Sequence, residues 1–574
     1  MSELHMSFGP RKPNLHARPL KARARVSTRR KCSGNLDFPA RPGRKAARII
    51  ASHRGREWMY PGTHAQARAD QPAIIMAGSG ETVTYRELEA RSNRLAHLLR
   101  AVGLKRRDHY AVFMENHARF IECDVAGERS GLYYTNVNSF LTAGELAYIV
   151  NNSLSQVLIT SQARRKVALE ALRECPNVGL CLIVDGPGEG TRIRNLDEAT
   201  AEFPATPIGD ESLGAAMLYS SGTTGRPKGI LRPLYDQPLA EPHPVLPSYM
   251  NNWRFREGMT YLMPAPLYHS APLVGAAGTI RLGGTLIVME RFDEEQFLHL
   301  VEKHRVTHTQ LVPTMFSRML KLPEAVRRRY DLSSLEAAVH GAAPCPVPVK
   351  EAMIGWWGPV IHEYYGATEG MGLAMCDSAE WLAHKGTVGR TVAGELHVLD
   401  EEMLEVPTGQ TGKLWFKTAS PFEYFNDPVK TAEANSPDRT MSTVGDIGRV
   451  DEEGYIYLTD RAAFMIISGG VNIYPQECEN LLITHPKVAD AAVFGAPNED
   501  LGEEVKAVVQ LTPEFGPCAD IADELMAFCR DHLAHHKCPR SIDFEAELPR
   551  LPTGKLYKGP LRERYWKGRE SRIV

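Results

Sequence analysis

The chain has 574 residues, of which 43% are hydrophobic and 24% charged, and its formal net charge is −2. This length exceeds what one hydrophobic core usually serves, so we expect at least two domains. No run of about 18 apolar residues predicts a membrane-spanning helix. The ten cysteines are scattered without a C-x-x-C pair, which indicates reduced thiols in a cytoplasmic protein and excludes a disulfide framework.

The first 57 residues differ in charge from the rest of the chain. They contain 15 Lys or Arg against three acidic residues, which leaves 52 basic and 66 acidic residues in the remainder. Because this stretch is rich in Arg and Pro and lacks apolar periodicity, we expect a disordered basic extension. A transit peptide, a nucleic-acid or membrane tail and a start codon assigned too early are all open, and the third is favoured. The acidic remainder argues against a nucleic-acid partner.

Residues 58–460 alternate between short apolar runs and helical patterns. Continuous apolar runs at 110–114, 157–160 and 180–184 predict strands buried on both faces. The leucine spacing within 85–102 predicts a helix between such strands. Alternation of this kind indicates α/β layers with parallel sheets. The residues around 409–416 predict a shorter antiparallel section.

A hydroxyl- and glycine-rich segment closed by a lysine occupies residues 219–229, directly after an apolar run. Its sequence Tyr-Ser-Ser-Gly-Thr-Thr-Gly-Arg-Pro-Lys-Gly offers backbone N–H groups and hydroxyls to an anion, and Lys228 adds a positive charge. A Walker A loop requires Ser or Thr directly after Gly-Lys. Pro227 precedes this lysine and Gly229 follows it, so the pattern predicts a phosphate-binding loop of another kind.

Further motifs follow in the large domain, each of which would alone be typical of a turn or a surface loop. They are Met-Pro-Ala-Pro-Leu-Tyr-His-Ser at 263–270, His-Gly-Ala-Ala-Pro at 340–344, His-Glu-Tyr-Tyr-Gly-Ala-Thr-Glu at 362–369, Val-Gly-Asp at 444–446 and Thr-Asp-Arg at 459–461.

Residues 461–574 form a second unit of a size typical of a small α+β domain. Strand-like segments at 465–467, 491–494 and 505–509 and a helix from about 475 to 484 are predicted. Three motifs belong to this unit: Ser-Gly-Gly-Val-Asn-Ile-Tyr-Pro at 468–475, Lys-Cys-Pro-Arg at 537–540 and Pro-Arg-Leu-Pro-Thr-Gly-Lys at 549–555.

Taken together, in this order and at this spacing, the motifs resemble the adenylate-forming (AMP-binding) superfamily, and within it the acyl-CoA synthetases. The resemblance covers nearly all of residues 58–574. It implies an α/β fold: a large N-terminal domain (58–460) of layered α/β subdomains with a small β-barrel section, and a mobile small α+β C-terminal domain (461–574).

The resemblance also assigns nucleotide-binding roles, with ATP, Mg²⁺ and coenzyme A as cofactors or co-substrates. The phosphate-binding residues would be Ser220, Ser221, Gly222, Thr223, Thr224, Gly225 and Lys228. Tyr365 would stack on adenine, beside a pocket lined by Gly341 and Ala342. The ribose would lie against Asp446 and Arg461. Thr368 would bind a phosphate, and Glu369 would hold Mg²⁺, a cation that prefers carboxylate oxygen.

Two half-reactions are implied. A carboxylate attacks the α-phosphorus of ATP to give acyl-AMP and pyrophosphate, with Lys555 contacting the carboxylate and the α-phosphate. The thiol of CoA then displaces AMP. Between the steps the small domain rotates and replaces Lys555 by a face at Ser468, Gly469 and Gly470 that admits the pantetheine arm. His269 would gate the acyl pocket or pack as a neutral core histidine.

The chain departs from the family pattern at its hinge, where Ala463 and Phe464 replace charged residues, and this affects the expected rate of domain closure. The segment ending at Lys555 resembles a target of protein lysine acetyltransferases, which would remove its charge. A homodimer is compatible with the sequence.

Apolar residues at 273–278 and 370–372 suggest a medium- or long-chain fatty acid, or a bulky aromatic or alicyclic acid, as substrate. An acyl-AMP ligase that loads a carrier-protein thiol is the alternative, and the short spacing from Glu369 to Asp446 disfavours it. The retention of Lys228, Glu369, Asp446 and Lys555 together argues against a nonenzymatic nucleotide-binding paralogue.

Overall fold

The computed structural model describes residues 60–220, 227–241, 250–418, 421–461, 464–468, 471–550 and 556–567. Within these ranges, no helix is long and apolar enough to cross a membrane. The basic extension expected at residues 1–57 lies outside the described residues.

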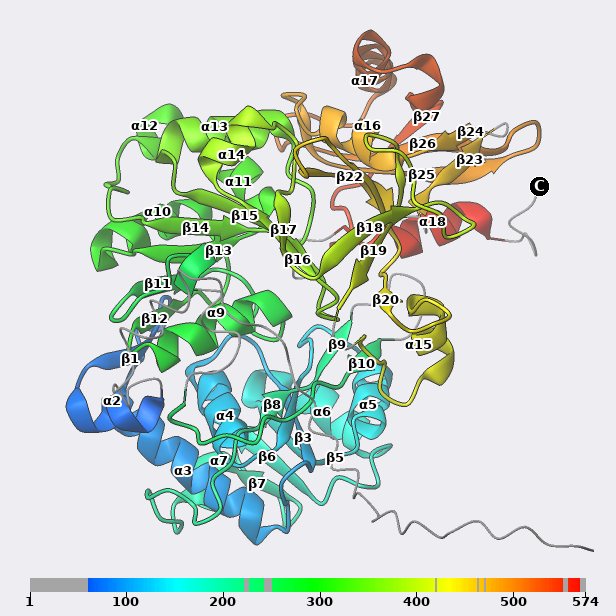
Figure 1. Ribbon diagram of the computed structural model, residues 1–574. Helices are drawn as coiled ribbons and strands as arrows, with labels where there is room; N and C mark the ends of the chain where they lie inside the picture. The colour runs from blue at the N-terminus through cyan, green and yellow to red at the C-terminus, as the bar shows by residue number, and fades with distance from the viewer. Residues whose placement is uncertain are drawn as a thin grey trace, which may run out of the picture. The chain divides into compact units, whose positions relative to one another are not determined.

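A nine-stranded sheet has the order β17-β16-β15-β14-β13-β11-β12-β1-β2 (Figure 1). Its central strands from β15 to β1 pair in parallel, while β2, β16 and β17 add antiparallel strands at the two ends. The bounds are β1 (Pro72–Met76), β2 (Thr82–Thr84), β11 (Thr260–Met263), β12 (Thr285–Val288), β13 (His308–Leu311), β14 (Ala337–His340), β15 (Ile361–Gly366), β16 (Leu373–Cys376) and β17 (Arg390–Ala393).

The helices associated with the nine-stranded sheet bury apolar side chains, except for the short helix α12, none of whose residues is buried. They are α2 (Pro61–Ala67), α9 (Ser270–Arg281), α10 (Glu294–His304), α11 (Pro313–Leu320), α12 (Glu324–Arg327), α13 (Val347–Trp357) and α14 (Ser378–Ala383). Phe297 on α10 and Phe316 on α11 each pack on Trp357 of α13, with ring centroids 5.9 Å apart in both pairs. This aromatic group anchors three helices in one core.

A six-stranded sheet has the order β7-β6-β5-β3-β4-β8, and all its pairings are parallel. Its strands are β3 (His109–Phe113), β4 (Tyr133–Asn136), β5 (Ser155–Ser161), β6 (Leu180–Val184), β7 (Ile193–Asn195) and β8 (Ala215–Ala216). Its helices are α3 (Tyr85–Ala101), α4 (Ala118–Arg129), α5 (Ala143–Asn152), α6 (Arg165–Leu172) and α7 (Leu196–Thr200). The strands predicted at 110–114, 157–160 and 180–184 and the helix at 85–102 are therefore confirmed.

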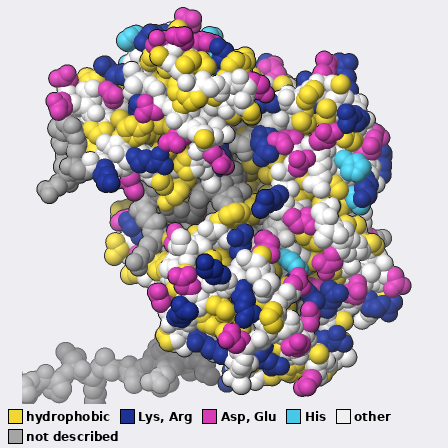
Figure 2. All heavy atoms as spheres, turned by 180° about the vertical axis from the view of Figure 1, so that it is seen from behind, with side chains coloured by type: hydrophobic (Ala, Val, Ile, Leu, Met, Phe, Trp, Pro, Cys, Tyr) yellow, Lys and Arg dark blue, Asp and Glu magenta, His cyan; other side chains and the backbone are white. Residues whose placement is uncertain are grey.

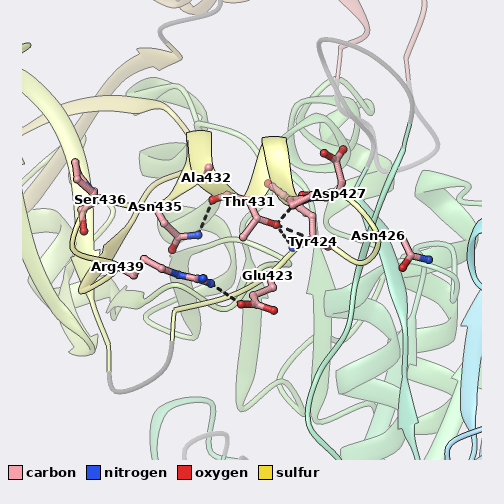
Figure 3. A pocket seen from close by; sticks show the side chains of 11 residues that line it. Glu423, Tyr424, Asn426, Asp427, Thr431, Ala432, Asn435, Ser436 and Arg439 are labelled. Atoms are coloured by element: carbon pink, nitrogen blue, oxygen red, sulfur yellow. Dashed lines mark hydrogen bonds and ion pairs between the residues drawn. The ribbon is translucent and has the colours of Figure 1, made fainter. Parts of the chain in front are cut away.

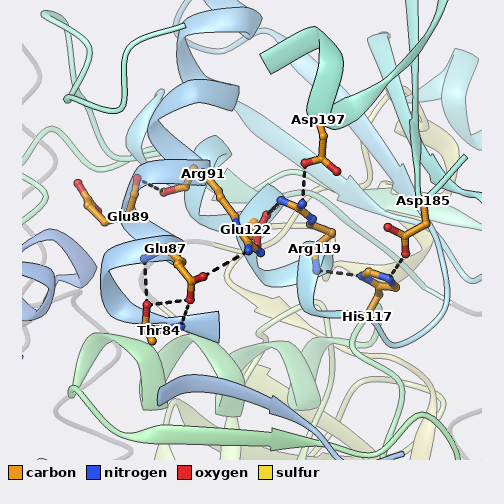
Figure 4. A network of polar contacts seen from close by, with 10 residues as sticks. Thr84, Glu87, Glu89, Arg91, His117, Arg119, Glu122, Asp185 and Asp197 are labelled. Carbon is orange, nitrogen blue, oxygen red and sulfur yellow. Dashed lines mark hydrogen bonds and ion pairs between the residues drawn. The ribbon is translucent and has the colours of Figure 1, made fainter. Parts of the chain in front are cut away.

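Charged side chains fix helices α3 and α4 to each other (Figure 4). The buried carboxylate of Glu122 accepts from Arg91 at 3.0 Å and from Arg119 at 2.7 Å. Arg119 also reaches Asp197 on α7 at 2.6 Å. Two guanidinium partners offset the cost of burying this carboxylate. At the start of α3, Thr84 and Glu87 form a capping box, which satisfies N–H groups of the first turn.

The predicted antiparallel section is a five-stranded sheet of order β18-β19-β21-β22, with β20 on β19. The strands are β18 (Glu395–Leu399), β19 (Gly412–Lys417), β20 (Met441–Ser442), β21 (Asp446–Val450) and β22 (Ile456–Arg461). Among the described residues no ladder joins β18 to β22, so these strands form a sheet, and its closure into the expected barrel section stays a prediction. Strands β9 (Leu218–Ser220) and β10 (Lys228–Ile230) form a separate hairpin, and α15 (Pro428–Ala434) precedes β20.

The C-terminal unit is an α+β domain with its own core. Its sheet has the order β24-β23-β26-β25, with β27 parallel to β26. The elements are β23 (Ile466–Ser468), β24 (Val471–Ile473), α16 (Pro475–Leu482), β25 (Val488–Asn498), β26 (Gly502–Leu511), α17 (Ala519–His532), β27 (Ser541–Phe544) and α18 (Lys558–Trp566). The fold class is thus confirmed, while the boundary at 460/461 stays a prediction.

Charges of both signs are mixed on one face of the molecule (Figure 2). On the face in Figure 2, acidic and basic side chains are interspersed and do not gather into one basic area. A nucleic-acid-binding face would present clustered Lys and Arg. No such cluster is seen on the face in Figure 2, and the absence of a nucleic-acid partner stays a prediction.

Candidate active site

The predicted site motifs of the large domain follow the carboxyl ends of neighbouring parallel strands. Gly341 and Ala342 follow β14, Thr368 and Glu369 follow β15, and His269 lies six residues after β11. Ligands of open α/β sheets bind in the crevice outside the carboxyl ends of the strands. The topology therefore gathers these motifs at the edge of the sheet where a ligand is expected.

Tyr365 and Asp446 meet, although they come from different sheets. The Tyr365 hydroxyl donates to Oδ2 of Asp446 at 2.8 Å across 81 residues of sequence. Both side chains are buried. Asp446 begins β21, where its backbone pairs with Arg461 of β22, so the two expected ribose-binding positions adjoin. The side chain of Arg461 lies outside what the structure describes.

The phosphate-loop motif is set between two paired strands. Ser220 at the end of β9 pairs with Lys228 at the start of β10. The intervening motif residues Ser221, Gly222, Thr223, Thr224 and Gly225 lie outside the described residues. The Nζ of Lys228 is 4.7 Å from the ring centroid of Tyr424. The hairpin thus places the two ends of the motif side by side.

Glu369 and Thr368 are each held by a residue that the motifs did not include. The hydroxyl of Tyr424 donates to Oε1 of Glu369 at 2.9 Å. The guanidinium of Arg232 donates to the backbone carbonyl of Thr368 at 2.9 Å. Both donors come from segments beyond the motif, and both fix the turn that follows β15.

His269 is a neutral imidazole. Burial lowers the pKa of His269 to about 3, so it carries no charge at neutral pH. Although the residue as a whole is only partly buried, its Nε2 is enclosed and has no hydrogen-bond partner among the described residues. The ring of Tyr268 lies 4.4 Å away, centroid to centroid. His269 therefore suits the wall of a pocket better than the pairing of a phosphate.

The loop after β14 has an unusual backbone. Ala342 adopts a left-handed φ of 69°, a conformation that costs a residue with a Cβ of order 1 kcal/mol. Tyr364 covers the neighbouring Gly341 so closely that a Cβ there would lie 2.5 Å from the tyrosine ring. This position therefore requires glycine because of the Tyr364 ring.

The C-terminal motifs are only partly described. Ser468 ends β23 and pairs with Val471 and Gly502, while Gly469 and Gly470 lie outside the described residues, as do Ala463 and Lys555. Residues flanking Lys555 are described: Arg550 pairs with Leu556, and Tyr557 N–H donates to the carbonyl of Pro549 at 2.8 Å.

At the other hinge position, the ring of Phe464 faces the ammonium of Lys558. The Nζ of Lys558 is 5.1 Å from the ring centroid of Phe464. Lys558 also pairs with the buried Glu479 at 2.6 Å. Phe464 therefore packs on a cation that a carboxylate already neutralises.

A magnesium ion fits the donor set at Glu369. In the described part of the chain, no group of three or more His, Cys, Asp or Glu side chains could hold a metal. Mg²⁺ is usually bound through one or two carboxylates together with substrate phosphates and waters. One carboxylate whose other oxygen is occupied by Tyr424 suits that mode and does not suit an all-protein cage.

Comparison with known proteins identifies the family. The model of the AMP-binding enzyme family matches residues 62–424, and that of the AMP-binding enzyme C-terminal domain matches residues 477–555. The chain belongs to the AMP-binding enzyme family. It is an AMP-forming acid–thiol ligase, as the sequence motifs predicted.

Two relatives and one solved structure illustrate the similarity. A fatty acid–[acyl-carrier-protein] ligase of Streptomyces coeruleorubidus is 32% identical, over 88% of this chain and 95% of the relative. A feruloyl-CoA synthase of Amycolatopsis sp is 33% identical, over 87% of this chain and 97% of the relative. The ATP-bound structure of MatB from Rhodopseudomonas palustris has a TM-score of 0.71 at 28% identity, over 88% of this chain and 99% of that one.

Proposed function

We propose that this AMP-binding enzyme is an ATP-dependent acyl-CoA ligase, which activates a carboxylic acid as acyl-AMP and releases AMP and pyrophosphate. The observation that carries the proposal is the 2.8 Å bond between Tyr365 and Asp446. It joins Tyr365, the residue expected under adenine, to Asp446, the residue expected at the ribose, and Tyr365 belongs to β15, the strand that leads to Thr368 and Glu369.

The side chains divide the work of adenylation. Lys228 and the motif from Ser220 to Gly225 receive the β- and γ-phosphates, and Thr368 binds a phosphate oxygen. Lys555 brings the carboxylate and the α-phosphate together. The barrier arises from repulsion between anions and from charge that gathers on phosphate oxygens, so positioned cations and N–H groups lower it. Neutral His269 adds no charge to the wall of the acid pocket.

Mg²⁺ bound at Glu369 would neutralise charge on the phosphates. Glu369 itself presents a carboxylate oxygen at a fixed orientation, because Oε1 is held by Tyr424. For the second half-reaction, Ser468, Gly469 and Gly470 line the path of the pantetheine arm. CoA supplies the nucleophilic thiol, so no side-chain nucleophile is needed.

The acid belongs to the fatty or the bulky aromatic and alicyclic class. The apolar lining expected at 273–278 supports this choice, and the names of the two relatives refer to a fatty acid and to feruloyl-CoA. The carrier-protein ligase among the relatives makes a carrier-protein thiol the second candidate acceptor.

The deciding experiment measures pyrophosphate release and AMP formation with ATP and Mg²⁺ across a panel of carboxylic acids, with CoA, with a carrier protein, or with neither. We expect CoA-dependent turnover with one acid class. Accumulation of acyl-AMP despite CoA, with turnover restored by the carrier protein, would move the assignment to the second candidate. An absence of pyrophosphate release with every acid would contradict both.

Asp446→Asn is expected to weaken ATP binding about tenfold, because an amide replaces a charged acceptor of the ribose hydroxyls. Calorimetry with ATP and with 2′,3′-dideoxy-ATP isolates this role. Wild type should lose affinity for the dideoxy analogue, and this loss should be much smaller in Asp446→Asn, because the amide is a weaker acceptor than the carboxylate. A variant that discriminates the two nucleotides as strongly as wild type would place the ribose elsewhere. Asp451→Asn, in the turn after β21, is the matched control.

The cytoplasm is the proposed location. The nine cysteines within the described residues are all free thiols, as expected in a reducing compartment. We also propose that the enzyme forms a homodimer and that a lysine acetyltransferase acts on Lys555.

A further inference from the structure

We propose that Tyr424 is a positioning residue that orients both the carboxylate of Glu369 and the ammonium of Lys228 for magnesium–ATP. The inference rests on the proposed function, since it assigns those two residues to the phosphates and the metal. Tyr424 belongs to no motif found in the sequence, and it lies 55 residues after Glu369.

The tyrosine contacts its two partners through different parts of the side chain. Its hydroxyl donates to Oε1 of Glu369 at 2.9 Å. The face of its ring receives the Nζ of Lys228, 4.7 Å from the centroid. A cation over an aromatic face is attracted by the ring quadrupole, and the attraction is stronger where water is excluded. Tyr424 as a whole is only 7% exposed, so water is largely excluded from the tyrosine side of both contacts.

The backbone makes the same connection. Ile230, two residues after Lys228, forms a bridge with Tyr424, and the N–H of Phe425 donates to the carbonyl of Gly229 at 2.8 Å. Strand β10 and the segment that carries Tyr424 are therefore paired directly. A shift of the lysine relative to the tyrosine would break backbone hydrogen bonds as well as the side-chain contact.

Helix α15 fixes the backbone of Tyr424 through Thr431. The N–H of Tyr424 donates to Oγ1 of Thr431 at 3.0 Å, and Thr431 Oγ1 donates to the carbonyl of Asp427 at 2.8 Å. These residues line a pocket of about 430 Å³ beside the helix (Figure 3). The backbone of Tyr424 is thus held by Thr431 of α15. Its ring and its hydroxyl contact Lys228 and Glu369.

The hydrogen bond from Tyr424 fixes the orientation of the Glu369 carboxylate. A carboxylate whose Oε1 accepts from a hydroxyl cannot rotate freely, and Oε2 is then presented at one orientation. A preorganised ligand loses less entropy when its partner binds. The hydroxyl should therefore increase the gain in ATP affinity that Mg²⁺ provides, while the ring should support ATP affinity even without the metal.

Tyr424→Phe separates these two roles, because it removes the hydroxyl and keeps the ring. We measure the dissociation constant of ATP by calorimetry, with Mg²⁺ and with EDTA, on the full chain. The factor by which Mg²⁺ tightens ATP binding should fall about tenfold in Tyr424→Phe. Affinity in EDTA should stay within about twofold of wild type. Tyr424→Leu should in addition lose about fivefold in EDTA, since it removes the ring.

The matched control is Tyr457→Phe, which removes a tyrosine hydroxyl that donates to Asp451 at 3.0 Å outside the site. It should leave both affinities unchanged, and thermal unfolding establishes that each variant is folded. An unaltered Mg²⁺ factor in folded Tyr424→Phe would overturn the inference while leaving the proposed function intact. Failure of the wild type to bind ATP would instead contradict the proposed function.

Discussion

Replacing Lys350 by methionine is expected to lower the free energy of unfolding by about 3–5 kcal/mol, because it leaves a buried carboxylate without its cation. Lys350 on α13 is fully buried, and its ammonium pairs with Glu363 on β15. The same ammonium lies 4.8 Å from the ring centroid of Trp381. His340, whose Nε2 lies 3.7 Å from Glu363, is a poor replacement, since burial is the main cause that holds the pKa of this imidazole well below its usual value.

The double variant Lys350→Met/Glu363→Leu tests this explanation. With both charges removed, much of the lost stability should return, because the desolvation cost of the pair disappears along with its attraction. Urea unfolding of wild type, both single variants and the double variant gives the coupling energy of the cycle. A double variant as unstable as Lys350→Met would mean that the lysine acts through packing alone.

The pH dependence of Lys350→Met has a definite sign. Burial raises the pKa of Glu363, and Lys350 opposes that rise. In the variant the folded carboxyl should therefore bind its proton more tightly than the unfolded one, whose pKa is about 4.3. The loss of unfolding free energy relative to wild type should be absent at a pH below the unfolded pKa and should grow as the pH rises above it. The loss should be complete once the pH exceeds the pKa of Glu363 in the folded variant. Unfolding curves at pH 5 and pH 8 check this order.

The sequence predicted those parts of the site that are local in the chain. Strands such as 180–184 were recognisable because a continuous apolar run suits a parallel strand buried on both faces. The motifs that follow β14 and β15 were recognisable because their residues are contiguous and chemically distinctive. Once such strands lie side by side in a parallel sheet, their carboxyl ends meet, so topology alone gathers the motifs.

Contacts between distant segments could not be predicted in this way. Tyr424 reaches Glu369 and Lys228 only because the segment 424–425 pairs with β10, and one tyrosine has no spacing that would reveal the contact. Likewise, Arg232 donates to the carbonyl of Thr368 from 136 residues away. The one local signal was the position of Tyr424 in an aromatic stretch, which is equally typical of a core.

Gly275 is a residue whose role the composition of its segment did not predict correctly. The apolar residues at 273–278 suggested the class of acid that the enzyme takes as substrate. In the structure, a Cβ on Gly275 would lie 2.5 Å from the Tyr261 hydroxyl of β11. This glycine therefore allows α9 to pack closely on the sheet, and the proposed acid class rests on the other residues of the segment and on the relatives.

Lys555→Ala is expected to slow acyl-AMP formation by about 10²–10³-fold, because it removes a cation placed where charge develops in the transition state. The small domain should remain folded. Pro549 and Tyr557, on either side of this segment, are joined by a backbone hydrogen bond, and Leu548 and Leu561 are buried in an apolar cluster. Thermal unfolding should therefore match wild type, and so should the activity of Lys567→Ala, which changes an exposed lysine at the end of α18.

The two half-reactions distinguish this role from a general loss of activity. When acyl-AMP is supplied, Lys555→Ala should form the thioester with CoA within about threefold of the wild-type rate, because the proposed rotation removes Lys555 before the thiol attacks. Acetylation of Lys555 should have the same effect, since it also abolishes the charge. Rates of pyrophosphate release and of thioester formation, measured separately, decide the matter. An equal loss of both steps would mean that Lys555 supports the site throughout the cycle, and the exchange of faces proposed for the small domain would then be wrong.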